Sequence, residues 1–127
     1  MRNTRQVIGK RGEDEACRLL EEMGHTIICR NWRHGHLEID IISLKENGLH
    51  IVEVKSLAAP AVTAPETKVN RSKRVKMVAG AKAFLNSDER RALPADMEVF
   101  FDVVSVIFDG PDFEIEYYPQ AFIPIYD

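Results

Sequence analysis

Cysteine is scarce in this chain, and its two cysteines, Cys17 and Cys29, are too few for a disulfide framework. We expect both to be reduced thiols. Long hydrophobic runs are also missing, since the apolar stretches fall far short of the roughly 20 residues that a membrane-spanning helix needs. The first residues lead into no apolar signal region, so the cytoplasm is the expected location. These absences exclude disulfide-stapled and membrane-spanning classes and predict no membrane partner.

An excess of positive charge is absent as well. The chain has 17 Lys and Arg against 20 Asp and Glu, for a net charge of −3. This balance argues against a nucleic-acid binder that works by bulk charge. Basic residues nevertheless gather near the N-terminus and again after the middle of the chain, where they include Lys68, Arg71, Lys73, Arg74 and Lys76. A solvated helix face would also explain either group.

The hydrophobic pattern predicts one α/β domain over residues 1–127, with 110–127 as a peripheral strand and tail. A mixed central sheet of about four or five strands, flanked by two helices, would bury the apolar faces. A crossover through the second helix allows parallel pairing of two strands. The predicted elements are a helix from Thr4 or Asn3 to Met23, ended by Gly24; a strand over 25–32; a hairpin over 37–56; a loop over 57–69; a helix from Asn70 or Ser72 to Asn86; and strands over 97–108 and 113–118.

The predicted hairpin over 37–56 carries charge inside its apolar strands. Glu38 and Asp40 interrupt the first strand, and Glu53 and Lys55 interrupt the second. Charges in such positions are costly unless they are paired, solvated or bound to a metal. This cost is the first indication of a functional site.

The register of the hairpin decides which charges meet. A two-residue turn at Asn47-Gly48, a dipeptide that accepts positive φ, would place Asp40 opposite Lys55. A four-residue turn over 45–48 would instead place Asp40 opposite Glu53, and Glu38 opposite Lys55. Side chains alternate between faces, so both registers bring two carboxylates and a lysine together, whereas a three-residue turn would separate them.

The first predicted helix adds a third acid. Its apolar stripe contains Ala16, Leu20 and Met23, and Glu13 projects at the edge of that stripe. One interpretation makes Glu13 a first-turn acid that complements the helix dipole. The other points it into a polar site beside the sheet, where Gly12 would allow a close approach.

Three convergent carboxylates suit a hard cation. Asp40, Glu53 and Glu13 would supply oxygen ligands, which favour Mg²⁺ or Mn²⁺ over zinc. Such a metal could activate a water and neutralise charge on a phosphate, while Lys55 could orient the water or stabilise negative charge. The structural alternative is a plain ion pair of Lys55 with Asp40 or Glu53.

These residues carry a resemblance that covers nearly the whole chain to about residue 108. Asp40 followed by Glu53-Val54-Lys55 resembles the PD-(D/E)xK nuclease signature. The chain as a whole resembles the YraN-like family of small bacterial proteins, which is similar to archaeal Holliday junction resolvases. The matching pieces are Gly12-Glu13, Arg30-Asn31-Trp32-Arg33, Glu38-Ile39-Asp40, Val52-Glu53-Val54-Lys55, Lys73 with Lys76, Ala83-Phe84-Leu85 and Phe101-Asp102-Val103-Val104.

Three positions depart from the family pattern. Leu37 stands where a glycine is usual, Leu57 where a basic residue is expected, and Phe100 where an arginine is expected. The proposed catalytic set is retained, and the lost positive charge is expected to weaken or retune phosphate contact.

The resemblance implies a restriction-endonuclease-like core and a Mg²⁺-dependent endonuclease that acts on DNA, at branched or damaged structures. Asp40, Glu53 and Glu13 would bind the metal and Lys55 would assist catalysis. Lys73, Lys76 and Arg33 are the candidates for phosphate contact. Resolvase-like relatives act as symmetric dimers, so a homodimer is expected by resemblance. The alternative function is a catalytically silent nucleic-acid-binding or interaction module with the same fold.

Overall fold

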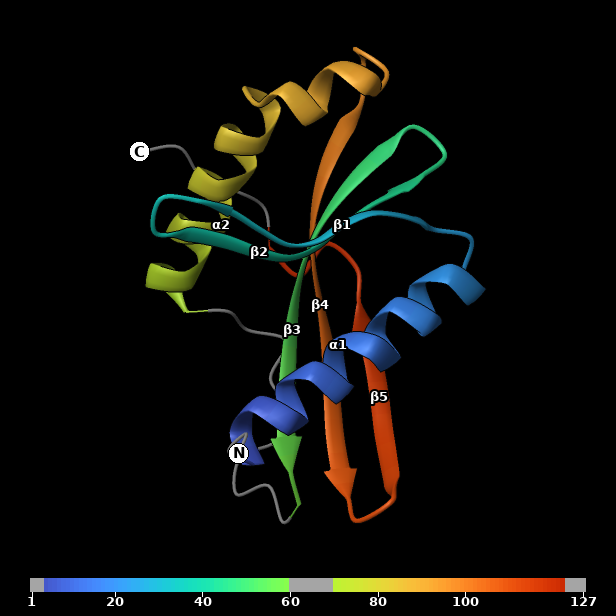
Figure 1. The fold of residues 1–127 in the computed structure, drawn as a ribbon. Helices are drawn as coiled ribbons and strands as arrows, with labels where there is room; N and C mark the ends of the chain where they lie inside the picture. Colours follow the sequence, from blue (N-terminus) through green and yellow to red (C-terminus); the bar gives the residue numbers. More distant parts are fainter. Residues whose placement is uncertain (1–3, 60–69, 123–127) are drawn as a thin grey trace.

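A computed structural model describes residues 4–59 and 70–122 and shows a sheet with a helix on each side (Figure 1). The predicted mixed α/β fold and element order are confirmed. Residues 60–69, most of the predicted loop, lie outside the described residues. The elements are α1 Thr4–Glu22, β1 Thr26–His34, β2 Leu37–Lys45, β3 Gly48–Ala58, α2 Arg71–Leu85, the 3₁₀ helix η1 Asp88–Ala92, β4 Glu98–Asp109 and β5 Asp112–Tyr118.

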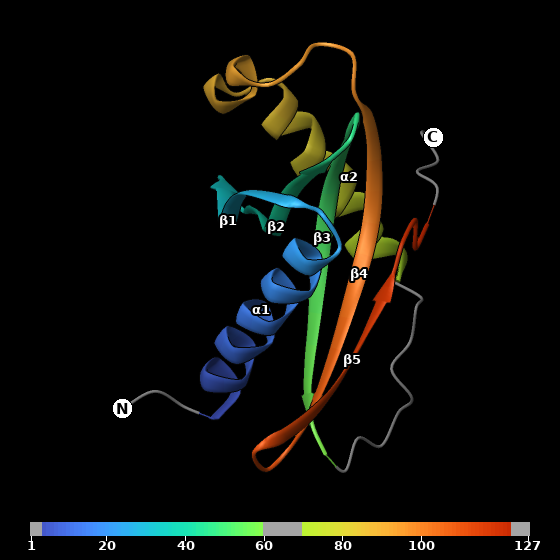
Figure 2. The same ribbon diagram turned by 90° about the vertical axis from the view of Figure 1, so that its right-hand side faces the viewer.

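The sheet has five strands in the order β1-β2-β3-β4-β5. Only the β3–β4 pair is parallel, and the crossover between those strands contains α2, as the sequence predicted. Figure 2 shows β3, β4 and β5 running side by side, while the β1–β2 hairpin projects away from them. The hairpin therefore leaves the long strands partway along the sheet.

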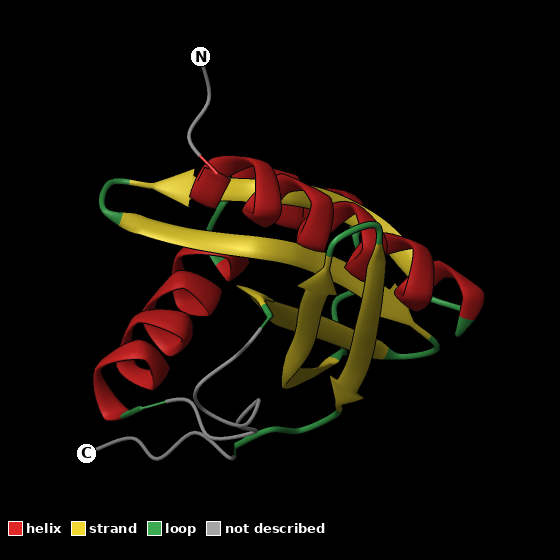
Figure 3. Ribbon diagram, turned by 90° about the horizontal axis from the view of Figure 1, so that it is seen from below, coloured by secondary structure: helices red, strands yellow, loops and turns green. Residues whose placement is uncertain are grey.

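The two helices cover opposite faces of the sheet and each buries its own cluster of apolar side chains (Figure 3). On the α1 face, Ala16 and Leu20 pack with Val52 of β3 and with β4. On the α2 face, Met77 and Phe84 pack with strands β2, β3 and β4. Burial on both faces of β3 explains the two adjacent apolar residues Ile51 and Val52, since Ile51 packs on the α2 face and Val52 on the α1 face.

The helix ends follow local sequence signals. Asn70 caps α2, since its side-chain oxygen accepts a hydrogen bond from the backbone N–H of Lys73 at 2.9 Å. Gly24 has a φ of 96°, which suits a residue just past the end of α1. Within the ranges 4–59 and 70–122, neither helix is long and apolar enough to cross a membrane.

The turn of the central hairpin corrects one prediction. Lys45 pairs with Gly48 and Leu44 with Leu49, so Glu46 and Asn47 form the turn, and Glu46 has the positive φ of 54°. The Asn47-Gly48 turn was therefore wrong, and the strands have the other predicted register, although their pairing ends at Ile41–Val52, one residue before Asp40 and Glu53. Gly48 is needed elsewhere, because a Cβ atom there would lie 2.8 Å from the ring of Phe100 in β4.

Candidate active site

The site lies where β2 and β3 separate. Their pairing runs from Lys45–Gly48 to Ile41–Val52 and stops there. Beyond that point β2 continues beside β1 as far as Leu37, and β3 continues beside β4 as far as Ala58. Figure 1 shows this fork between the two strands. The next residues on the two sides of the fork are Asp40 and Glu53, which places two acids at its base.

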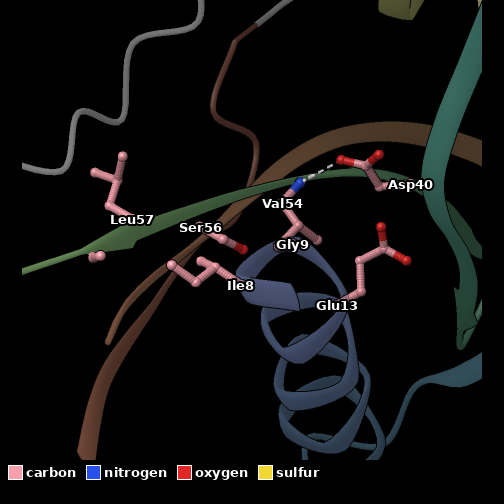
Figure 4. Close-up of a pocket in the computed structure, with 8 residues that line it drawn as sticks. Ile8, Gly9, Glu13, Asp40, Val54, Ser56 and Leu57 are labelled. Carbon is pink, nitrogen blue, oxygen red and sulfur yellow. Dashed lines mark hydrogen bonds between the residues drawn. The ribbon is translucent and has the colours of Figure 1, made fainter. Parts of the chain in front are cut away.

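The Asp40 side chain takes over a hydrogen bond of the interrupted ladder. Its Oδ2 atom accepts the backbone N–H of Val54 at 2.9 Å, as the dashed line in Figure 4 marks. This bond fixes the carboxyl between the two diverging strands. A backbone N–H that loses its strand partner is commonly satisfied by a side chain.

The electrostatics of this pair are unfavourable. Burial, followed by the charge of Glu53, raises the pKa of the Asp40 carboxyl to about 7, against the opposing Val54 hydrogen bond. Burial also raises the pKa of Glu53, while Lys73 and a hydrogen bond with Asp40 lower it. The raised pKa values favour a protonated form of the pair, because two ionised carboxyls this close together in a half-buried position repel each other.

Lys73 of α2 forms an ion pair with this carboxyl pair. Its Nζ atom lies 3.2 Å from Glu53 Oε1, and the Glu53 side chain is only 13% exposed. The sequence predicted Lys73 as a phosphate contact but did not predict this ion pair. Burial is the largest effect on the pKa of Glu53 and raises it. Lys55, two residues beyond Glu53 on β3, lowers this pKa by less than Lys73 does.

Glu13 reaches the same site from the α1 side of the sheet. It lies in the middle of α1 and not in its first turn, so the helix-dipole interpretation is wrong. Gly12 allows this approach, because a Cβ atom there would lie 1.8 Å from Ser56 Oγ on β3. Figure 4 shows the Glu13 carboxyl extending toward Asp40. Glu13 Oε1 also accepts a hydrogen bond from Asn31 Nδ2 at 2.9 Å.

A hollow of about 500 Å³ opens beside Asp40 and Glu13. It lies between the N-terminal half of α1 and the C-terminal end of β3. Its lining residues are Ile8, Gly9, Glu13, Asp40, Val54, Ser56, Leu57 and Ala58. The hollow is therefore continuous with the candidate site and extends away from the carboxyl groups along β3.

The predicted set of three metal ligands is brought together only in part. Asp40 meets Glu53, and Glu13 faces Asp40 while bonding Asn31. Among the described residues, no group of three or more His, Cys, Asp or Glu side chains is placed so that it could hold a metal ion. The pair of Asp40 and Glu53 is thus the part of the predicted ligand set that the fold assembles.

The other two predicted phosphate contacts lie apart from the carboxyl pair. Arg33 forms its ion pair with Glu38, with Arg33 Nη2 3.6 Å from Glu38 Oε1, and its side chain is 71% exposed. Lys76 is exposed on α2, three residues beyond Lys73. The fold therefore places Lys73 at the carboxyl pair, Lys76 on the surface nearby, and Arg33 near the β1–β2 turn.

A second buried polar cluster lies nearer the hairpin turn and was missed by the sequence analysis. Asp102 of β4 is fully buried and accepts hydrogen bonds from Tyr117 Oη at 2.6 Å, the Gln120 N–H at 2.9 Å and His50 Nδ1 at 2.5 Å. The ring of His25 lies 4.6 Å from that of His50, and its Nδ1 is 2.9 Å from Ser43 Oγ. The one signal in the sequence was an aspartate inside an apolar strand.

Comparisons with known proteins place the chain among small bacterial proteins. The model of the uncharacterised protein family UPF0102 matches residues 12–106. A UPF0102 protein of Bacteroides thetaiotaomicron is 39% identical over 117 residues, covering 92% of this chain and 93% of the relative. A UPF0102 protein of Nitratidesulfovibrio vulgaris is 38% identical over 122 residues, covering 96% of this chain and 88% of the relative. One from Flavobacterium johnsoniae is 35% identical over 115 residues, covering 91% and 93%.

Proposed function

The chain belongs to the uncharacterised protein family UPF0102, and we propose that it is a Mg²⁺- or Mn²⁺-dependent endonuclease that hydrolyses phosphodiester bonds in DNA. In this proposal it is a restriction-endonuclease-like protein of the PD-(D/E)xK superfamily that acts in the cytoplasm on branched or damaged DNA. The observation that carries the proposal is the pair of half-buried carboxyls, Asp40 and Glu53, that come together at the base of the fork, where Asp40 is held by the backbone N–H of Val54.

The donor set fits a divalent cation. Asp40 and Glu53 offer hard oxygen ligands, and their raised pKa values show that negative charge is poorly compensated there. A bound cation would supply the positive charge that allows both carboxyls to ionise beside a phosphate. Asp40 and Glu53 would hold the cation directly. Glu13 would complete the set of carboxyl ligands by giving up its hydrogen bond with Asn31 and turning to the cation.

The remaining charged groups would bind and orient the reactants. Lys55 lies two residues from Glu53 on the same strand, where its ammonium could donate to an attacking water or to a phosphate oxygen. Lys73 holds Glu53 in the free protein and would exchange that carboxyl for a phosphate oxygen of the substrate. Both roles require positive charge next to the carboxyl pair, which Arg33 does not provide.

A cleavage assay tests the proposal. Four-way junction, flap and linear DNA are incubated with the protein in Mg²⁺ and in Mn²⁺, and products are resolved on denaturing gels. We expect cleavage that Asp40→Asn and Lys55→Ala each reduce by at least about 100-fold, the usual scale for a lost catalytic group. Glu38→Gln is the matched control, because Glu38 is an exposed acid on the same strand that pairs with Arg33.

Two other outcomes are informative. A protein that binds these DNAs without cutting them in either metal would contradict the nuclease proposal and would support a silent nucleic-acid-binding module. Residual cutting that survives Asp40→Asn would point to a contaminating nuclease. Sedimentation of the protein with and without junction DNA would test the proposed homodimer, which would place one site on each strand of a symmetric junction.

A further inference from the structure

The hollow beside the candidate site has two chemically different ends. Figure 4 shows Glu13 and Asp40 at one end and Ile8 and Leu57 at the other, with Gly9 and Ser56 between them. The end formed by Ile8 and Leu57 is aliphatic, and Val54, next to Asp40, adds an apolar side chain to the lining. Its volume of about 500 Å³ falls within the range of small-molecule sites, about 300–1,000 Å³. A ligand for this space needs an apolar body.

Phosphate does not fit the lining. Among the described residues, the walls include two carboxyl side chains and neither a lysine nor an arginine. A phosphate inside the hollow would therefore meet two carboxyls, Glu13 and Asp40, and no cationic side chain among the described lining residues. A nucleobase is uncharged, has two apolar faces for aliphatic walls, and carries edge groups that Ser56 and a carboxyl can bond.

Gly9 keeps the wall of α1 open at this point. A Cβ atom at Gly9 would have no heavy atom within 4 Å, whereas one at Gly12 would clash with Ser56. The two glycines of α1 therefore differ in function. Gly12 lets the helix pack on β3, and Gly9 leaves room in the hollow.

We propose that the hollow binds one unstacked nucleobase of the DNA strand whose backbone lies at Asp40 and Glu53. The proposal rests on the proposed function for the position of that backbone. A base inside a duplex is covered on both faces by its neighbours, so the hollow can accept only a base that is unpaired or turned out of the helix. The site would thus favour DNA with unpaired nucleotides next to the scissile position, such as the arms of a flap.

Gly9→Leu tests the proposal with little risk to the fold. The added side chain would extend into open space at a helical position where leucine is favoured over glycine. Gly9→Ala is the matched control, because it gives the same kind of helix stabilisation and fills far less of the hollow. Circular dichroism melting curves should show that both variants fold.

The readout is a cycle that pairs Gly9→Leu with removal of single bases from the DNA. Dissociation constants are measured by fluorescence anisotropy for flap DNA with an abasic site at each position near the branch. Ca²⁺ replaces Mg²⁺, and the DNA is checked to be intact. At one position we expect base removal to weaken wild-type binding about tenfold, the scale of a lost base contact, and to change binding of Gly9→Leu by less than twofold. Gly9→Ala should behave as the wild type does.

The proposal would be overturned if base removal changed the dissociation constants of wild type and Gly9→Leu in the same way at every position. It would also be overturned if base removal weakened wild-type binding at no position. The two proposals fail separately. Cutting that depends on Asp40 without the abasic coupling would retain the nuclease and remove the base site. Coupling without cutting would retain the base site and remove the nuclease.

Discussion

The sheet carries two acidic clusters, one buried and one half-buried, that differ in how well their charge is satisfied. Asp102 has no exposed surface and three hydrogen-bond donors, from Tyr117, Gln120 and His50. Asp40 has one backbone donor and faces a second carboxyl, Glu53. Both clusters adjoin the β2–β3 ladder, one near the hairpin turn and one at the fork.

The difference distinguishes a cluster that stabilises the fold from the candidate functional site. A buried carboxylate with a full set of donors stabilises a single arrangement of the strands around it. Two buried carboxyls that repel each other destabilise the fold, and such conflicts are typical of sites that bind ions or perform catalysis. The free energy of unfolding should therefore respond in opposite directions when each cluster is neutralised.

The largest expected effect is at Asp102. Asp102→Asn leaves donors facing an amide nitrogen in a fully buried position, so we expect a loss of about 3–5 kcal/mol in the free energy of unfolding. Urea denaturation at pH 7 measures it. Asp109→Asn, at the exposed end of the same strand, is the control and should change stability by less than about 0.5 kcal/mol. A small effect at Asp102 would mean that its donors contribute little to the fold.

The opposite sign is expected at Asp40. Its pKa is raised from 3.8 to about 7, so the unfolded chain releases this proton first and stability is lost as pH rises between these values. Asp40→Asn keeps an acceptor for Val54 without the charge. We expect it to stabilise the protein by about 1–3 kcal/mol at pH 8 and by little at pH 4. Glu38→Gln should show no such pH dependence, and a destabilising Asp40→Asn would favour a purely structural role.

The Asp102 cluster should show the reverse pH dependence through His25. Burial, with the charge of His50 as the next cause, lowers the pKa of His25 from 6.5 to about 4. The charge of Asp102 raises the pKa of His25, and the charge of Lys45 lowers it. Ser43 Oγ contacts the His25 ring. The unfolded state binds the proton first, so stability should fall by about 1–2 kcal/mol as pH drops from 6.5 to 4. The decrease in the free energy of unfolding between pH 6.5 and 4 should become smaller in His25→Gln. It should persist in His36→Gln, which alters an exposed histidine.

The smallest expected effect concerns DNA affinity. Lys76 is exposed near Lys73, so Lys76→Ala should remove at most one phosphate contact. The slope of log K against log salt concentration would then become shallower by about 0.9 for duplex DNA. Lys82→Ala, at the other end of α2, is the control. An unchanged slope would assign Lys76 to a solvated helix face.

Much of the fold followed from local patterns. The apolar periods predicted two helices and four or five strands in the observed order, and the alternation along the hairpin limited its register to two choices. The turn dipeptide did not identify the register, because Gly48 lies in β3 against the ring of Phe100 and not in the turn. This contact joins residues that are far apart in the sequence, so the dipeptide alone could not reveal it.

The candidate site was predictable only where one hairpin builds it. Asp40 and Glu53 come from paired strands, so the hairpin pattern in the sequence was enough to predict that they lie close together. The ion pair of Glu53 with Lys73 depends on how α2 lies on the sheet. The contacts among Asp102, Tyr117 and His50 depend on the order of β3, β4 and β5. Neither arrangement leaves a periodic signal in the sequence.

The hydrogen bond from the Val54 amide to Asp40 also gives the protein a built-in spectroscopic reporter. The chemical shift of an amide proton depends on the charge of its acceptor, and this acceptor titrates near neutral pH. One cross-peak in a nitrogen–proton spectrum would therefore follow the ionisation of the carboxyl pair. A second movement of the same peak on addition of Mg²⁺ would be a direct test of the proposed metal site, separate from the titration.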